Sequence, residues 1–579
     1  MSDLQLETHR KNAKTFDFVP VVNVDLDDSK WKAKHDSISI EGDETRYLAL
    51  MTEMLSYNPK RIDKQSGNPN TIPQKHYRAV VGRYAKQGLP WLSKNKLISV
   101  YHQLVAKGLL EHNPIDLTRI QKKPTRSQSG VAVVTVLTKP FPCPGKCIFC
   151  PTDVRMPKSY LHDEPGAQRA ERHNFDPFDQ TRSRIEALIG NGHPTDKIEL
   201  LILGGTWSSY RRDYQEWFIK RCFDAMNAPD DPDSADLPAA QTLNINTRHR
   251  NVGLVVETRQ DHIDADELRW LRYLGVTKVQ VGIQSMDEHV LAINKRGHDP
   301  QATRDAFRLL RLGGFKIHGH WMANLLGATL ESDLADYRSL WSDPAVRPDE
   351  LKIYPCMLVP NADLYAYWQR GEYQPYTEED LTELLVDCMV DTPRYVRLTR
   401  VIRDIPTTNV VAGNKKANLR QIASRRMKKR ELDCHDIRSR EIRRQNVTWD
   451  DLELQDIEYD AGSTIEHFLS FETKDNRLAG FLRLSFPKPD QTLPLPELAN
   501  HAMIREVHVY GPVMQLGAGS TGEAQHMGIG SRLITHAKSM ALAAGFSHLA
   551  VISAIGTQGY YAKHGFTVNN LYMATALVE

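Results

Sequence analysis

Three of the seven cysteines, Cys143, Cys147 and Cys150, lie within eight residues, directly after a strand-like run at 131–137. Thiolates are the ligands that suit iron–sulfur clusters. A cubane [4Fe-4S] cluster bound by three local thiolates would keep its remaining iron open for a substrate. The alternative is a structural zinc knuckle completed by a distant Cys or His, although zinc sites usually come as paired knuckles. The scattered positions of the other cysteines do not suggest a disulfide framework.

Polar residues also follow other strand-like runs, where a bound cofactor would find hydrogen-bond partners. The run at 198–203 ends in two glycines, and glycine lets the backbone approach a ligand closely. The runs at 253–257 and 276–283 carry polar side chains that need partners once the strands are buried. Taken singly, each feature is explained equally well by a turn or a hydrogen-bond network in the core. The candidate ligand-binding residues are Gly204, Gly205, Thr206, Glu257, Arg259, Gln280 and Gln284.

A second candidate site lies near the C-terminus, where a glycine-rich turn precedes a helical stretch at 532–544. Glycines at a helix start expose backbone N–H groups, which together with the helix dipole bind anions. The turn follows a strand-like run at 506–510 and resembles the pyrophosphate loop of GNAT acetyltransferases, which hold coenzyme A. As a lone pattern it gives many false positives. The candidate residues are Gln525, Gly528, Ile529, Gly530 and Ser531, with Tyr560 or Tyr561 either reaching the thioester or packing.

Two different α/β units must position these groups. Between 131 and 354, short apolar runs alternate with helical stretches, which indicates a parallel α/β sheet or barrel, full or partial. In such folds the functional residues gather at the carboxyl ends of the strands. At 579 residues the chain exceeds one ordinary core, so we expect several domains. The expected parts are a flexible N-terminal arm at 1–45, a helical, basic segment at 46–127, the parallel unit at 128–412, a basic linker at 413–450 and a smaller α/β unit at 451–579.

The composition is typical of a soluble globular protein, with 25% charged residues. No apolar run approaches the roughly 20 residues of a membrane helix, and the N-terminus lacks the apolar core of a signal peptide, so we expect a cytoplasmic protein without a membrane partner. Residues 415–444 hold twelve Lys or Arg against four Asp or Glu. This excess indicates a phosphate-binding surface, although a solvated helix with charged faces explains it equally well. The candidate RNA-binding residues are Lys122, Lys123, Arg126, Arg425, Arg426, Lys428, Lys429 and Arg430.

Taken in order, these motifs resemble a known family. The C-x3-C-x2-C spacing with an aromatic residue before the last cysteine is the signature of radical S-adenosylmethionine (SAM) enzymes. A radical SAM domain followed by a GNAT domain is similar to the catalytic third subunit of Elongator and its bacterial and archaeal relatives, which modify the wobble uridine of tRNA. Further motifs that carry the resemblance lie at 123–132, 164–167, 176–178, 403–406, 438–441 and 505–511.

The resemblance implies a partial (βα) radical-SAM barrel joined by a basic linker to a GNAT-type α/β domain. It also implies a [4Fe-4S] cluster on Cys143, Cys147 and Cys150, SAM on the open iron, and acetyl-CoA as co-substrate. The expected reaction adds a carbon radical from the acetyl group to C5 of the wobble uridine in the tRNA anticodon loop. Thioester hydrolysis then leaves 5-carboxymethyluridine, and an electron donor completes the set of partners. The coenzyme A contacts carried over from the family are Lys197, Glu506, Val507, His508, Val509, Ile529, Gly530, Ser531 and Tyr561, of which Tyr561 is also assigned to catalysis.

Two other functions stay open. One is a protein lysine acetyltransferase that uses only the GNAT domain, with Glu506 as candidate general base and a structural cluster. The other is a tRNA-binding scaffold in which both sites have decayed. The chain departs from the family pattern at several places: Gln260 replaces a proline, Gln280 stands where many relatives have glutamate, and the segment 320–327 lacks the prolines typical of that loop. Since Cys434-His435 is the only nearby pair, we predict no structural zinc, and the sequence leaves open whether the protein is a homodimer or a stand-alone monomer.

Overall fold

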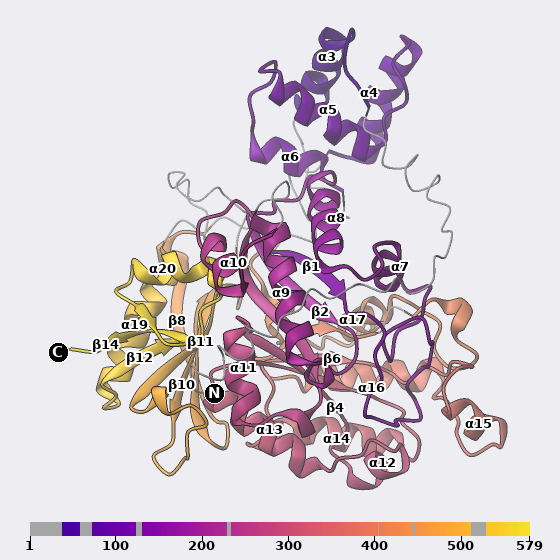
Figure 1. Ribbon diagram of the computed structural model, residues 1–579. Helices are drawn as coiled ribbons and strands as arrows, with labels where there is room; N and C mark the ends of the chain where they lie inside the picture. Colours follow the sequence, from indigo (N-terminus) through magenta and orange to yellow (C-terminus); the bar gives the residue numbers. More distant parts are fainter. Residues whose placement is uncertain are drawn as a thin grey trace.

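The computed structural model describes most of the chain, and Figure 1 shows how its parts are arranged. Residues 1–37 of the arm predicted at 1–45 lie outside the described residues, as do the candidate residues Lys123, Arg126 and Gln525. The described residues are 38–57, 72–122, 130–227, 233–402, 405–443, 447–510 and 528–578.

The N-terminal part is a small helical unit with a core of its own. Buried Tyr47, Leu50, Val80, Leu97 and Tyr101 belong to a hydrophobic cluster separate from that of the two sheets. In Figure 1 these indigo helices project from the top of the molecule, beyond the first sheet. The helices are α3 (Glu44–Leu55), α4 (Gln74–Lys86), α5 (Lys94–Ala106) and α6 (Pro114–Ile120).

The first sheet has seven parallel strands in chain order, from β1 at one edge to β7 at the other. Its two edge strands do not pair, so the expected partial (βα) barrel is confirmed. The strands are rich in Val, Ile and Leu, as strands buried on both faces require. Their bounds are β1 (Ala132–Leu137), β2 (Lys197–Leu203), β3 (Arg250–Thr258), β4 (Lys278–Gln284), β5 (Lys316–Trp321), β6 (Glu350–Ile353) and β7 (Arg397–Arg400).

Helices connect these strands or, in the case of α17 and α18, follow the last of them, and many begin at an N-cap that the sequence itself supplies. The carboxylates of Asp264, Asp287 and Asp299 each accept a backbone N–H of the first turn, which stabilises the start of the helix. The helices are α7 (Pro165–Arg172), α8 (Pro177–Ile189), α9 (Arg212–Asn227), α10 (Leu237–Asn244), α11 (Ala265–Tyr273), α12 (Glu288–Ile293), α13 (Pro300–Leu312), α14 (Leu330–Ser342), α15 (Leu364–Gln369), α16 (Glu378–Val390), α17 (Leu419–Lys429) and α18 (Ile437–Arg440).

The C-terminal unit is a mixed sheet in the order β13-β14-β12-β11-β10-β9-β8. Only β11 and β12 are parallel, and their pairing ends at Ile504 opposite Val551. The last residues of β11 therefore extend beyond β12, as the splayed sheet of a GNAT domain requires. The elements are β8 (Leu452–Asp460), β9 (Thr464–Thr473), β10 (Leu478–Pro487), β11 (His501–Val509), α19 (Ile529–Ala543), β12 (His548–Val551), α20 (Gln558–Ala562), β13 (Thr567–Asn569) and β14 (Tyr572–Ala576).

The two sheets share one hydrophobic core and a buried ionic cluster. Arg505 of β11 forms hydrogen bonds of 2.7 Å to both oxygens of Asp349, which precedes β6. The same guanidinium binds Glu466 of β9, and all three side chains are almost fully buried. The segment expected as a basic linker is also packed, because Leu419 and Met427 of α17 are buried in this common core. The two α/β units thus form one continuous body.

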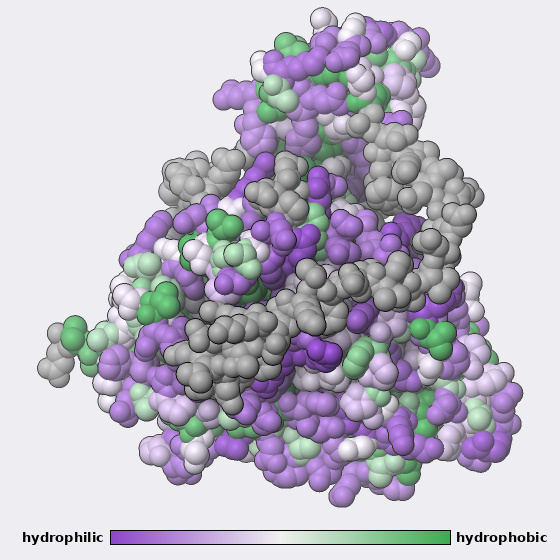
Figure 2. All heavy atoms as spheres, viewed as in Figure 1, coloured by the Kyte–Doolittle hydropathy of each residue, from purple (hydrophilic) through white to green (hydrophobic). Residues whose placement is uncertain are grey.

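The surface of this body is mainly polar. On the face shown in Figure 2, hydrophobic residues form small patches scattered among hydrophilic ones. Among the helices of the described residues, none has both the length and the apolar character needed to span a membrane.

Candidate functional site

The segment 138–151, which carries the three cysteines and is called the cysteine loop, follows β1 directly and lies at the carboxyl ends of the parallel strands. Cys147 is buried, and Cys143 and Cys150 are half-buried. The Cys143 sulfur lies 3.6 Å from the Thr206 hydroxyl and accepts a 3.4 Å hydrogen bond from the Gly145 backbone N–H. The loop therefore brings the Cys143 thiol close to the polar segment that follows β2.

Two guanidinium groups add positive charge to this loop. Arg296 donates from Nη1 to the Cys147 sulfur at 3.5 Å. A hydrogen bond with Cys150 and the charge of Arg296 lower the pKa of the Cys147 thiol to about 5, although its burial acts in the opposite direction. Arg259 lies so close that a Cβ on Gly145 would stand 2.4 Å from its Nη1. These surroundings therefore favour the thiolate of Cys147, the form that binds iron.

The same residues fit an anionic cluster. Nη1 of Arg259 and Nε of Arg296 are buried and have no hydrogen-bond partner among the described residues. Buried donors of this kind need an acceptor, and a cluster held by three thiolates would supply acceptor sulfurs. Across the described part of the chain, no three His, Cys, Asp or Glu side chains converge as ligands of one metal ion would. The thiolates of a cubane bind different iron atoms, so they need not converge on one point.

Sequence reasoning missed Arg296. It follows α12 and is separated from Cys147 by 149 residues. The local sequence Lys295-Arg296-Gly297 has no feature that marks it as a cluster neighbour, so only the fold reveals the contact.

The two predicted glycines after β2 allow neighbouring segments of the chain to approach their backbone closely. Gly204 has φ +143°, and a Cβ there would lie 1.8 Å from the Thr138 hydroxyl oxygen. Gly205 has φ +89°, also in the region that favours glycine, and packs against the Lys158 backbone. The glycines thus let β1 and β2 end side by side beneath the cysteine loop.

The four polar residues predicted on β3 and β4 lie at two depths. The Gln284 amide lies beside the Arg296 guanidinium, since a Cβ on Gly282 would contact both groups. Because Arg296 contacts Cys147, Gln284 lies near the cysteine loop. Arg259 lies at the same level. Glu257 and Gln280, which face each other across β3 and β4, lie deeper along the strands. Only Arg259 and Gln284 are therefore placed beside the cysteine loop.

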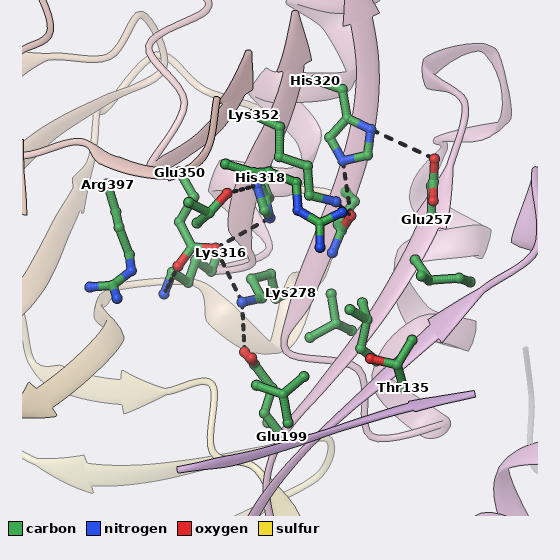
Figure 3. A pocket seen from close by; sticks show the side chains of 18 of the residues that line it. Thr135, Glu199, Glu257, Lys278, Lys316, His318, His320, Glu350, Lys352 and Arg397 are labelled. Carbon is green, nitrogen blue, oxygen red and sulfur yellow. Dashed lines mark hydrogen bonds and ion pairs between the residues drawn. The ribbon is translucent and has the colours of Figure 1, made fainter. Parts of the chain in front are cut away.

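One cavity of about 790 Å³ joins the two candidate cofactor sites. Its wall includes Cys150 at the cysteine loop and Glu506, His508 and Tyr561 in the C-terminal unit. The strands of the partial barrel line the space between them, and Figure 3 shows charged side chains from several strands pointing into it. The cavity therefore spans both α/β units.

An alternating chain of ion pairs crosses the floor of this cavity (Figure 3). Lys278 lies 2.6 Å from Glu199 and 3.1 Å from Glu350, and Lys316 lies 2.7 Å from Glu350. Lys316 also pairs with Glu506 on β11, so the chain ends in the C-terminal unit. Burial alone would raise the pKa of Glu350, but the two lysines hold it well below its ordinary value.

The predicted coenzyme A residues come from both α/β units. Lys197 on β2 is close enough to His508 on β11 for its charge to help lower the pKa of that histidine, which burial and other cations bring to about 3. Ile529, Gly530 and Ser531 form the first turn of α19, preceded by Gly528 with φ +76°. The start of this helix therefore has the conformation that an anion site needs.

The structure separates the roles of the two adjacent tyrosines. Tyr561 is buried, and its ring lines the cavity. Tyr560 is 38% exposed and lies at the start of α19, where its hydroxyl would be 2.5 Å from a Cβ on Gly530. Of the two, only Tyr561 faces the space shared with the cysteine loop.

The predicted RNA-binding residues of α17 differ in their environments. Arg426 pairs with Glu379 and Glu383 of α16, and Arg430 also pairs with Glu383. The remaining members, Arg425, Lys428 and Lys429, are exposed. Lys122 is half-buried at the end of the N-terminal unit. The acidic face of α16 thus neutralises part of the basic surface, which the local sequence of α17 does not reveal.

Comparisons with known proteins agree with this architecture. The model of the Radical SAM superfamily matches residues 142–336, and the Radical_SAM C-terminal domain matches residues 348–429. A tRNA uridine(34) acetyltransferase of Methanocaldococcus infernus is 40% identical over 81% of this chain and 89% of its own length. Elongator complex protein 3 of Homo sapiens is 34% identical over 81% of this chain and 88% of its own length.

A solved structure gives the same result. The archaeal Methanocaldococcus infernus Elp3 with an N-terminal deletion matches 78% of this chain and 100% of that chain, at 36% identity and a TM-score of 0.67. Identity of this extent, together with the cysteine loop and the two joined α/β units, shows that the chain belongs to the radical SAM family of tRNA uridine(34) acetyltransferase and Elongator complex protein 3.

Proposed function

We propose that this protein uses SAM and acetyl-CoA to convert the wobble uridine of tRNA into 5-carboxymethyluridine. The observation that carries the proposal is the single cavity that reaches from Cys150 to Tyr561. A reaction that joins an acetyl-derived carbon to a base needs both cofactor sites to open onto one space. The names of the relatives, which specify tRNA uridine(34), supply the substrate class.

Cys143, Cys147 and Cys150 would hold a [4Fe-4S] cluster, which with SAM and an electron donor would supply the radical chemistry needed to activate the acetyl methyl group. The chain itself orients the partners and excludes water. Arg259 and Arg296 balance the negative charge of the thiolates. The residues proposed to contact SAM beside this loop are Gly204, Gly205, Thr206, Arg259 and Gln284.

Acetyl-CoA binds, in this proposal, where β11 diverges from β12. The first turn of α19 and the turn before it hold the pyrophosphate, and Lys197 adds a point charge from the other unit. Tyr561 then faces the acyl group within the cavity. The residues assigned to this site are Lys197, Glu506, Val507, His508, Val509, Gln525, Gly528, Ile529, Gly530, Ser531, Tyr560 and Tyr561.

Protein lysine acetylation by the C-terminal unit alone is less well supported. That reaction needs a general base with a pKa near the working pH, and Glu506 is the candidate. Its carboxylate pairs with Lys316 and, at 3.0 Å, with Arg483. Burial alone would raise the pKa of Glu506, but these two cations hold it below its ordinary value. A carboxylate stabilised in this way is a poor base.

An anaerobic assay tests the proposal. Reconstituted full-length protein is incubated with SAM, acetyl-CoA, reductant and tRNA, and 5′-deoxyadenosine and modified uridine are measured by mass spectrometry. We expect Cys147→Ser to abolish both products. Cys434→Ser is the matched control, because Cys434 lies outside the cavity and its sulfur donates to Asp436, as a serine hydroxyl also would. Modified uridine that survives Cys147→Ser would exclude the radical route, and acetylated protein without modified tRNA would favour lysine acetylation.

A further inference from the structure

A row of polar side chains crosses the middle of the cavity, between the cysteine loop and the ion-pair chain on its floor. It consists of Glu257 on β3, Gln280 on β4, His320 on β5 and Lys352 on β6. Figure 3 shows Glu257, His320 and Lys352 extending into the same space from their separate strands. Neither cofactor site, as proposed above, requires Gln280, His320 or Lys352.

The hydrogen bonds of this row fix its pattern of donors and acceptors. Lys352 donates from Nζ to Oε1 of Gln280. The Nε2 atom of His320 lies 2.9 Å from the same oxygen. Because an amide oxygen only accepts, His320 must carry its proton on Nε2 to make this bond. The row therefore presents one acceptor, the Gln280 oxygen, between two donors, Lys352 on one side and His320 on the other.

Lys352 is not explained by the stability of the fold. Its side chain lines the cavity, and no carboxylate of the described residues forms an ion pair with it. Burial, together with the charges of Arg400 and Lys278, lowers its pKa to about 7, although the nearby carboxylates of Glu257 and Glu350 act in the opposite direction. An apolar side chain of similar size would avoid the cost of burying this charge. A half-buried lysine whose side chain lines a cavity is therefore more easily explained by a ligand that accepts its hydrogen bond.

Uracil has the complementary pattern. Along its pairing edge, O4 accepts, N3–H donates and O2 accepts. Cytosine has a donor at N4 and an acceptor at N3, so it would place a donor against Lys352 and a lone pair against the Gln280 oxygen. A base held by this edge also leaves C5 accessible, because C5 lies on the side of the ring opposite N3 and O2.

We propose that Lys352, Gln280 and His320 read the pairing edge of the flipped wobble uracil and select it over cytosine, an inference that rests on the proposed function. Lys352 donates to O4, Gln280 accepts from N3–H, and His320 donates to O2. On binding, the base exchanges its own hydrogen bonds for those within the row. Gln280, predicted from the sequence to contact SAM, is reassigned here to the nucleobase.

The test uses anticodon stem-loop RNAs that are identical except for uridine, cytidine or 4-thiouridine at the wobble position. Since the phosphate contacts are the same, differences in affinity report the base alone. Binding to the full-length protein is measured by fluorescence anisotropy without SAM or acetyl-CoA, and kcat/KM for uridine modification is measured separately. Sulfur is a weak hydrogen-bond acceptor, so 4-thiouridine tests the contact to Lys352 specifically.

Wild-type protein should bind the uridine RNA about tenfold or more tightly than the other two, the discrimination typical of a site built from buried polar groups. Lys352→Met should weaken binding of the uridine RNA to within about threefold of the cytidine and 4-thiouridine RNAs, whose own affinities change little. Lys352→Arg, which keeps a donor, should restore part of the preference. Lys488→Met is the control, because Lys488 pairs with Asp460 away from the cavity and should retain wild-type discrimination.

Equal binding of uridine and cytidine RNAs by the wild type would overturn the inference, as would a Lys352→Met variant that keeps the wild-type preference. If Lys352→Met keeps the wild-type preference and the wild-type protein still modifies uridine, the proposed reading of the base is wrong and the proposed function stands. If the wild type discriminates through Lys352 but makes no modified uridine, the reading site stands and the proposed function fails.

Discussion

Replacing Arg505 with methionine removes the guanidinium that joins the two sheets. Arg505 donates at 2.7 Å to each oxygen of Asp349 and at 2.7 and 2.9 Å to Glu466. It also donates at 3.0 Å to the Phe315 carbonyl oxygen. The guanidinium and both carboxylates are at most 1% exposed, so water cannot replace the lost partner. Arg505→Met therefore leaves the two buried carboxylates with less positive charge and fewer hydrogen-bond donors around them.

The size of the effect follows from this burial. Removing one partner of a buried ion pair costs about 3–5 kcal/mol, because the remaining charge stays desolvated. Arg483 and Arg311 still lie 3.5 and 3.9 Å from Asp349, so part of the compensation remains. We therefore expect a loss near the lower end, about 3 kcal/mol of unfolding free energy.

Urea denaturation followed by tryptophan fluorescence measures this loss, and the chain offers a matched control. Arg269 also forms an ion pair across the two units, with Glu497, but its side chain is 29% exposed. Such partly solvated pairs contribute about 0.2–1 kcal/mol. Arg269→Met should therefore change stability far less than Arg505→Met. The reasoning is refuted if the two variants lose the same free energy, or if Arg505→Met loses less than about 1 kcal/mol.

The same cluster predicts a pH dependence. Burial alone would raise the pKa of Asp349, but Arg505, Arg483 and Arg311 hold it well below its ordinary value. A carboxyl group with a lowered pKa in the folded state stabilises the protein above its unfolded pKa, about 3.9, and loses this contribution as the pH falls through the folded value. The stability difference between wild type and Asp349→Asn should therefore be constant at neutral pH and shrink below about pH 4. A difference that grew on acidification would contradict this sign.

Three further outcomes are expected. Gly204→Ala should reduce iron loading after reconstitution severalfold, because its Cβ would fall 1.8 Å from the Thr138 hydroxyl oxygen at φ +143°; unchanged iron content would contradict the close approach. Lys197→Met should raise the KM for acetyl-CoA about tenfold without a similar change for SAM, as loss of one charge-assisted phosphate contact implies. Replacing Lys428 and Lys429 with alanine should weaken tRNA binding and lower the slope of log affinity against log salt by up to about two, whereas an unchanged slope would place tRNA elsewhere.

Much of the site was predictable because its chemistry is local in sequence. The spacing of Cys143, Cys147 and Cys150 places three thiols on one loop, and the strand before them sets that loop at the functional edge of a parallel sheet. Gly204 and Gly205 were singled out because they follow a strand-like run next in order after the cysteine loop, and both adopt backbone conformations that other residues rarely adopt.

Residues that act through distant partners were not predictable in this way. Arg296 gives no local sign of its contact with Cys147, and the shared acceptor of Lys352 and His320 on Gln280 comes from three separate strands. The pairing of Arg426 with acids of α16 likewise depends on how two helices pack.

The sequence by itself therefore determined the cysteine loop, the alternation of strands and helices, and the order of the two α/β units. Those features follow from the spacing of residues, the type of side chain and the period of the apolar positions, all of which can be read within a few neighbouring residues. Only the tertiary structure decided that one cavity connects the cysteine loop to Tyr561, and that Arg505 and Asp349 join the sheets. Contacts of this kind join residues far apart in the chain, and their partners are set by the packing of the whole core.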